Sequence, residues 1–227
     1  MKSTLILVTL FLLMSFSSRA ATERVTVSLT GGEPNGSSVV NDITPNGRYI
    51  VFTTGASDLI TGDTNNKQDV YLYDTESDTL EIVSVTDGEA LANGDSYEAS
   101  ISDDGRYVSF TSTATNLADT DTNAATDVFL RDRTLGTTTR ISRSSAGAQA
   151  NGNSSRSAIS GDGSTVAFES AATNLVAGDL NDATDIFIHV PSSNTTSRVS
   201  LSDAEAEIAL DSNRAAISSD GNIVVFE

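Results

Sequence analysis

Several residue types that stabilise or activate other proteins are scarce in this chain of 227 residues. It contains no Cys, no Trp, one His and three Pro. The lack of Cys excludes disulfide bonds, so stability must come from packing alone. Aromatic residues make up 6% and hydrophobic residues 38% of the chain, which is lean for one large core but suits many thin, repeated packing layers.

Basic residues are also few. The chain has 13 Lys and Arg against 31 Asp and Glu, a net charge of −18. Such a chain repels nucleic acid phosphates and anionic lipid surfaces, so neither is expected as a partner. A protein, a cation or a neutral glycan stays open as a partner.

No apolar run is long enough to span a membrane, which needs about 20 residues. The longest run, 5–14, follows the positive start at Met1 and Lys2 and precedes small residues around Ala20. This pattern predicts a secretory signal peptide over 1–20. We therefore expect an exported protein, in the periplasm, at the cell surface or outside the cell. Removal of Lys2 and Arg19 would make the net charge two units more negative, and no membrane insertion is expected afterwards.

Residues 21–227 repeat themselves every 58 positions without a gap. The register holds for glycine, phenylalanine, isoleucine, serine and aspartate columns: Gly47, Gly105, Gly163 and Gly221; Phe52, Phe110, Phe168 and Phe226; Ile43, Ile101, Ile159 and Ile217; Ser38, Ser96, Ser154 and Ser212; Asp63, Asp121 and Asp179; Asp69, Asp127 and Asp185. So many columns in one register are not expected by chance. The repeats are expected at about 36–86, 94–144, 152–202 and, incomplete, 210–227.

Each repeat contains four strand signals rich in β-branched and aromatic residues. A tight turn ending in Gly follows the first strand, and Asn-Gly or Asp-Gly suits turns that need positive φ. Four antiparallel strands per unit predict an all-β protein, a β-propeller of four-stranded blades. Tandem sandwich domains are the structural rival, but they need about seven strands per unit.

The ends of the repeat array carry two further expectations. Residues 24–30 match the fourth strand shifted by 58, so they are expected as a lone fourth strand. About 3.5 blades are then present, fewer than the 4–8 of typical rings. We expect the sequence to be a fragment of a larger ring, or else a ring completed by a second copy. Open blade edges favour self-association.

The units resemble the WD-repeat-like propeller repeat of the TolB family. The resemblance rests on ISDDG at 101–105 with Phe110, on ISSDG at 217–221 with Phe226, and on GDTN at 62–65, DVFLRD at 127–132 and NLV at 174–176. The last three are similar to a long variant of the repeat found in exported bacterial proteins. It covers the chain from about Arg24 onward and implies a propeller fold. WD repeats proper need a Trp-Asp pair, which the chain lacks.

Strand alternation places the long connections of each unit, 53–68 and 86–95 in the first, on one face. Long loops on a rigid scaffold are the usual place for binding. Oxygen side chains recur there two positions apart, which resembles part of a calcium loop: Asp63 and Asn65, Asp121 and Asn123, Asp179 and Asn181. The same residues also form local turns, the interpretation that the sequence favours.

The sequence favours a non-catalytic interaction module that binds a protein or a glycan. The only His, His189, is expected on the surface of a strand, and no Gly-x-Ser-x-Gly elbow occurs. Neither a catalytic residue nor a cofactor is expected. Two alternatives stay open: an accessory propeller of a longer, peptidase-like secreted hydrolase, and a structural repeat of a large cell-surface protein.

Overall fold

The computed structural model describes residues 24–227, so the predicted signal peptide lies outside the described residues. The strands of the first blade are β1 (Ser38–Ile43), β2 (Tyr49–Thr54), β3 (Asp69–Asp74) and β4 (Thr79–Ile82). Those of the second are β5 (Ser96–Ile101), β6 (Tyr107–Ser112), β7 (Asp127–Asp132) and β8 (Thr137–Arg140). The third has β9 (Ser154–Ile159), β10 (Val166–Ser170), β11 (Asp185–Val190) and β12 (Thr195–Arg198), and a fourth sheet pairs β13 (Ala216–Ile217) with β14 (Val224–Val225).

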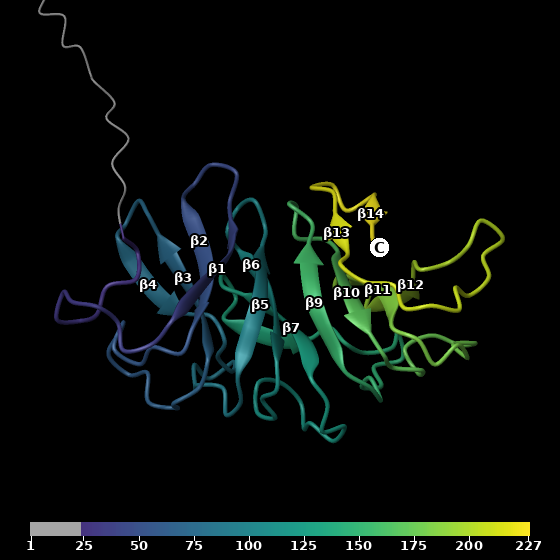
Figure 1. Ribbon diagram of the computed structural model, residues 1–227, viewed down its shortest axis with the longest axis horizontal. Coiled ribbons are helices and arrows are strands. Elements are labelled where there is room, and N and C mark those ends of the chain that lie inside the picture. Colours follow the sequence, from purple (N-terminus) through teal and green to yellow (C-terminus); the bar gives the residue numbers. More distant parts are fainter. Residues whose placement is uncertain (1–23) are drawn as a thin grey trace, which may run out of the picture.

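Each complete blade is an antiparallel sheet whose strands follow one another in chain order. The first strands of adjacent blades contact each other, so these strands form the inner side of the arc. The blades stand side by side along that arc (Figure 1). The prediction of a partial β-propeller with about 3.5 blades is confirmed. Within residues 24–227 no helix is long and apolar enough to cross a membrane.

The apolar core is divided into layers that lie between the blades. In one layer Val70 and Leu72 of the first blade pack with Phe110 and Phe129 of the second. The next layer joins Val128 and Leu130 to Phe168 and Phe187 of the third blade in the same way. Successive residues of a strand point to opposite faces, so each central strand supplies two layers. One blade alone therefore has no closed core.

A stacked pair of aromatic rings on the two central strands anchors each complete blade. The ring centroids of Phe110 and Phe129 are 5.9 Å apart, and those of Phe168 and Phe187 are 5.8 Å apart. In the first blade Tyr71 replaces the second Phe and stacks on Phe52 at 5.7 Å. The hydroxyl of Tyr71 makes this pair chemically different from the other two.

In the second and third blades the tight turn packs on the preceding blade. Gly105 has a φ of 74°, and a Cβ atom there would lie 2.1 Å from the Tyr49 ring. Gly163 bears the same relation to Tyr107, at 2.4 Å. Gly47 has a φ of 73° but faces open space. Glycine therefore allows the positive φ at each of these turns. In the second and third turns it also leaves room for a tyrosine ring of the preceding blade.

These two turns predict different costs for one substitution. Gly47→Ala should destabilise the protein by about 1–2 kcal/mol, the cost of a left-handed conformation for a residue with a Cβ. Gly105→Ala should cost about 1–3 kcal/mol more, because the Tyr49 ring must move. Urea unfolding of both variants measures the difference. Equal losses would show that the contact with Tyr49 is unimportant.

The expectation of a lone fourth strand at 24–30 is wrong, because the structure forms no strand there. A fourth strand bonds to the third strand of its own blade, as β4 does to β3, and the described residues place no such strand beside 24–30. Val25 nevertheless packs against the layer of Phe52, Leu59 and Tyr71. Val83 and Ile141, 58 and 116 positions later, pack in the next two layers, so the repeat predicted the contact but not the strand.

Both ends of the arc expose apolar side chains. Val39 is 60% and Ile43 is 50% exposed on β1, whereas Ile101 and Ile159, the repeat equivalents of Ile43, are buried between blades. At the other end Ile223 is 63% and Val225 is 59% exposed. The two end faces are therefore the places where a neighbouring surface would complete a layer.

Candidate functional site

The long connections of all three complete blades lie on one face, as predicted (Figure 1). The connections from the second to the third strand cover residues 55–68, 113–126 and 171–184. Those from the fourth to the first strand of the next blade cover 83–95, 141–153 and 199–215. We call this side the long-loop face. The other two connections are tight turns at the opposite side.

The long-loop face is braced by hydrogen bonds between its loops. Asn93, at the end of the connection that enters the second blade, receives the N–H of Thr115, which follows the second strand of that blade, at 2.8 Å. Its own N–H donates to Asn116 at 2.9 Å. Asn151 makes the same two bonds with Thr173 and Asn174 one blade later, at 2.8 and 3.0 Å. The loops therefore hold one another in place, which gives the face a fixed shape.

The six calcium candidates lie at the base of these loops, where the Asn residues act as turn residues. Asn65 Oδ1 accepts the N–H of Lys67 at 2.9 Å, a local turn. Its Nδ2 donates to Asp69 at 2.8 Å and to the carbonyl of Ala92 at 3.1 Å. Asn123 and Asn181 make the corresponding bonds to Asp127 and Asp185. In each unit the amide thus joins the loop to a buried carboxylate.

Each of these loops places two carboxylates close together away from solvent. In the first unit Asp63 is 8% and Asp69 is 0% exposed. Asp69 accepts hydrogen bonds from Ser84 at 2.7 Å and from Asn65. Asp63 accepts the Tyr71 hydroxyl at 2.6 Å, while its other oxygen is buried without a hydrogen-bond partner. A buried charge without a partner is expensive, so the pair needs compensation.

The second and third units provide that compensation with an arginine from the fourth strand. Arg140 lies 3.2 Å from Asp127 and 3.7 Å from Asp121. Arg198 lies 3.2 Å from both Asp179 and Asp185. The first unit has Ile82 at this position and Tyr71 where the others have Phe. The chain therefore contains two solutions to one electrostatic problem: a hydroxyl donor once and a guanidinium twice.

The pKa values of the acid pairs and of Tyr71 reflect their burial and the donors around them. Burial raises the pKa of Asp69 to about 6 against the bonds from Ser84 and Asn65, which lower it. Burial, together with the bond to Asp63, raises the pKa of Tyr71 and keeps its hydroxyl protonated. Burial also raises the pKa of Asp127, but the Ser142 bond and the charge of Arg140 oppose the shift. The first unit thus keeps its acid pair with the least positive charge nearby.

Replacing the arginine of the second unit by a tyrosine hydroxyl tests whether the two groups compensate the acid pair equally well. Arg140→Ile should leave Asp121 and Asp127 uncompensated and destabilise the protein by about 3–5 kcal/mol. Adding Phe129→Tyr should restore part of the loss, because its hydroxyl would reach Asp121 as Tyr71 reaches Asp63. Thermal unfolding of the single and double variants, with Phe129→Tyr alone as control, measures the recovery. A double variant no more stable than Arg140→Ile would refute the exchange.

The calcium hypothesis stays a prediction, and the arginines restrict it to the first unit. Among the described residues no group of three or more His, Asp or Glu side chains is arranged to hold a metal ion. Calorimetric titration with CaCl₂, and melting with and without EDTA, should be compared for wild type and Asp63→Asn. Heat and a raised Tm seen only in wild type would establish the site. If CaCl₂ produces no heat with the wild type and EDTA leaves its Tm unchanged, the calcium hypothesis is refuted.

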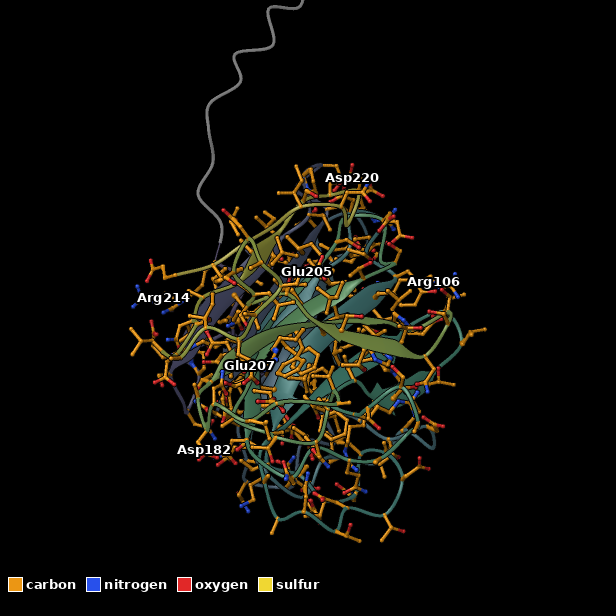
Figure 2. The ribbon with its side chains drawn as sticks, turned by 90° about the vertical axis from the view of Figure 1, so that its right-hand side faces the viewer. Arg106, Asp182, Glu205, Glu207, Arg214 and Asp220 are labelled. Carbon is orange, nitrogen blue, oxygen red and sulfur yellow. The ribbon has the colours of Figure 1, made fainter. Side chains whose placement is uncertain are left out.

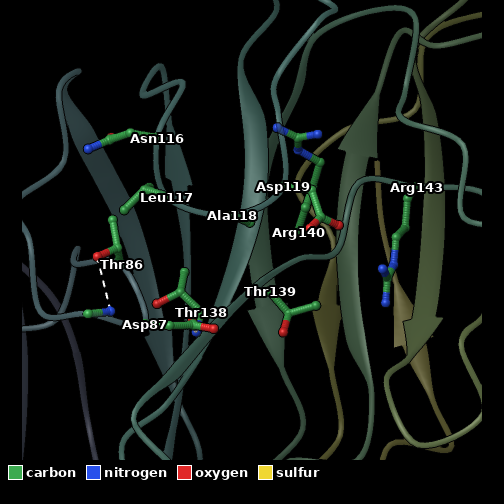
Figure 3. Close-up of a pocket in the computed structure, with 11 residues that line it drawn as sticks. Thr86, Asp87, Asn116, Leu117, Ala118, Asp119, Thr138, Thr139, Arg140 and Arg143 are labelled. Carbon is green, nitrogen blue, oxygen red and sulfur yellow. Dashed lines mark hydrogen bonds between the residues drawn. The ribbon is translucent and has the colours of Figure 1, made fainter.

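The long-loop face also bounds a cleft of about 400 Å³ beside the second blade. Thr86 and Asp87 from the connecting loop form one side, with Asn116 and Asp119 from the loop before β7 (Figure 3). Thr139 and Arg140 of β8 and the following Arg143 form the rest of the wall. The cleft is polar and open, so it suits a ligand held by hydrogen bonds.

Charged residues on the inner strands link the blades. Arg156 lies 3.7 Å from Glu98 of the previous blade and 3.2 Å from Glu169 of its own. Its backbone N–H also donates to Glu98, and that of Arg214 donates to Glu169 at 2.5 Å. Figure 2 shows Arg214 projecting from the C-terminal end of the arc, where its side chain lies 3.4 Å from Glu227. These bonds from Arg156 and Arg214 to glutamates of the preceding blade therefore join the blades.

The expectation that His189 lies on the strand surface is wrong, because the residue is completely buried. The third strand turns this side chain toward the connection between the second and third blades. The column includes Tyr73 and Arg131, and in the second blade Arg131 is also buried. The 58-residue spacing aligns Tyr73, Arg131 and His189. Because one is aromatic and two are basic, the sequence does not indicate that this position is buried.

Comparisons with known proteins bear on the fold. The structure is similar to TolB from Acinetobacter baumannii, with a TM-score of 0.51, 16% identity, and 84% of this chain covering 37% of that one. The putative TolB from Agrobacterium tumefaciens gives a TM-score of 0.51 and 18% identity over 81% of this chain and 51% of that one. The chain has a TolB-like β-propeller fold. It spans about half or less of the length of these structures.

The structure also matches dipeptidyl peptidase 4 from Porphyromonas gingivalis, with a TM-score of 0.44 and 12% identity over 80% of this chain and 26% of that one. No protein-family model matches the sequence. No curated protein matches it either. At these identities the comparisons with solved structures establish the fold alone.

Proposed function

We propose that this chain is part of an exported, non-catalytic interaction module whose long-loop face binds a protein or a glycan. The observation that carries the proposal is the bracing of that face. Asn93 and Asn151 each tie the loop that enters a blade to the loop after the second strand of that blade, so a partner meets a surface that is already ordered. A preformed surface loses little conformational entropy on binding.

Charge narrows the class of partner. The net charge of −18 disfavours nucleic acid and anionic lipid. The cleft beside the second blade offers hydroxyl, amide and carboxylate groups from Thr139, Asn116 and Asp119, which suit a hydrogen-bonding ligand. Self-association through the apolar end faces, and a role beside the catalytic domain of a longer hydrolase, stay predictions.

Site-specific photocross-linking in the native cell tests the protein branch. A photoreactive residue at Asp119, on the long-loop face, should capture a partner, because the residue is exposed. The same residue at Thr134, exposed in the turn after β7 on the opposite side, is the matched control.

A glycan array tests the other branch, with Asn93→Ala as the variant that removes one brace. Binding that is weakened by this substitution would support the glycan branch. Cross-links only from Thr134, together with an array that shows no binding, would overturn the proposal. A protein captured from Asp119 would establish the long-loop face as a protein-binding surface, whatever the result of the glycan array.

A further inference from the structure

The junction between the second and third blades contains a cavity of about 470 Å³ on the tight-turn side. Its wall includes Thr137 and Thr139 of β8, the turn at Gly163, and His189 and Pro191 of the third blade, with Arg143 beside them. Pockets for small molecules usually measure about 300–1,000 Å³. Thr139 and Arg143 also line the cleft beside the second blade, so the two spaces are neighbours, but the turn at Gly163 and Pro191 place this cavity toward the tight-turn side.

The equivalent space at the first junction is filled. Arg131 and Arg133 stand there at the positions of His189 and Pro191. Arg133 pairs with Glu81 at 2.5 Å and lies over the Tyr49 ring at 4.9 Å, while Arg131 pairs with Glu89. A cavity of only about 130 Å³ is left.

The second junction has lost both arginines of that arrangement and both acids. Thr139 stands at the position of Glu81, and Gly147 at that of Glu89. The larger cavity therefore results from named substitutions between two repeats of one chain.

Arg143 adds a positive charge to this junction at a position where the neighbouring repeats have Val85 and Leu201. Within residues 24–227 it is the one arginine without an ion pair. Its Nε atom is buried and has no hydrogen-bond partner. Acids outnumber basic residues by 31 to 13, so a missing partner does not reflect a shortage of carboxylates.

His189 supplies an unused acceptor in the same wall. Thr196 Oγ1 donates to the carbonyl of Arg143 at 2.5 Å, so it accepts a hydrogen bond from His189 Nδ1 at 2.9 Å. Nε2 is then the unprotonated nitrogen, and it is buried without a partner. Burial, and next the charge of Arg143, lower the pKa of His189 to about 4, so the ring is neutral at pH 7.

The other charges in the wall are already engaged. Asp132 accepts two hydrogen bonds from Arg106, at 3.0 and 2.7 Å. Asp162 accepts hydrogen bonds from Ser160 at 2.6 Å and from the N–H of Ser164 at 2.9 Å. Arg143 and His189 are therefore the groups left for a ligand: a positive donor and a neutral acceptor.

We propose that this cavity binds a small carboxylic acid that carries a hydrogen-bond donor next to its carboxylate. The carboxylate pairs with Arg143, since guanidinium and carboxylate form strong charge-assisted hydrogen bonds. The adjacent donor, a hydroxyl or an amide N–H, bonds to His189 Nε2. A uronic sugar and the C-terminal residue of a peptide both have this chemistry.

His189 is the chain's only histidine, so its imidazole Cε1–H gives one assignable NMR signal. The chain is titrated at pH 7 with glucuronate and with N-acetylglycine, each against its neutral analogue, glucose and N-acetylglycinamide. At least one acid should shift the signal, and its neutral analogue should bind about tenfold more weakly or worse, because the charge-assisted bond is lost. The acid that binds identifies the source.

Three variants complete the test. Arg143→Leu, which introduces the residue of the next repeat, should abolish the preference for the acid. Thr139→Glu, which restores the acid of the first junction, should pair with Arg143 and block binding in a chain whose melting curve stays cooperative. Lys67→Gln removes one positive charge elsewhere and should leave binding unchanged. The proposal is overturned if neither acid shifts the signal, if neutral analogues bind equally, or if both site variants keep the acid preference.

Discussion

The structure depends on one constraint: a sheet with two apolar faces is stable only between two other sheets. Val83 is an example. It directly follows β4, the last strand of the first blade, and its side chain packs with Phe110 and Leu117 of the second blade. Ile141 repeats the contact one blade later. Each layer therefore needs residues from two repeats in a fixed register, which explains why the spacing of 58 holds without insertions. A shifted blade would misalign two layers at once.

The long loops inherit their order from these layers. Because every blade repeats the same strand register, Asn93 and Asn151 meet equivalent loop atoms, each in the blade that its own loop enters. The layers also enclose the base of each loop, where the acid pairs lose water and must be compensated within the blade. Arg140 performs this role in the second blade and Tyr71 in the first. The face that we propose for binding is thus rigid for the same reason that the core is stable.

The repeat made the fold predictable, since strand patterns, turn glycines and loop lengths are local signals that recur in register. It predicted the contact of Val25 but not its lack of strand structure, because strand formation needs a partner that a sequence pattern does not provide. It also missed the burial of His189, since alternation along a strand does not say which face meets the next blade. The roles of Asn65 and its equivalents depend on which amide atom faces the carboxylate, a geometry that side-chain spacing leaves open.

Residues that recur in every repeat stabilise the blades, whereas two residues that depart from the repeat have no structural role of this kind. Phe110, Gly105 and Asp127 recur because each blade faces the same packing and charge problem, and their contacts account for them fully. Arg143 and His189 have no such account, since the neighbouring repeats are stable with other residues at those positions. The Nε atom of Arg143 and the Nε2 atom of His189 are both buried without a hydrogen-bond partner, which reduces stability unless something binds there. Departures from a repeat that leave polar atoms unsatisfied are therefore where a ligand is best sought in this fold.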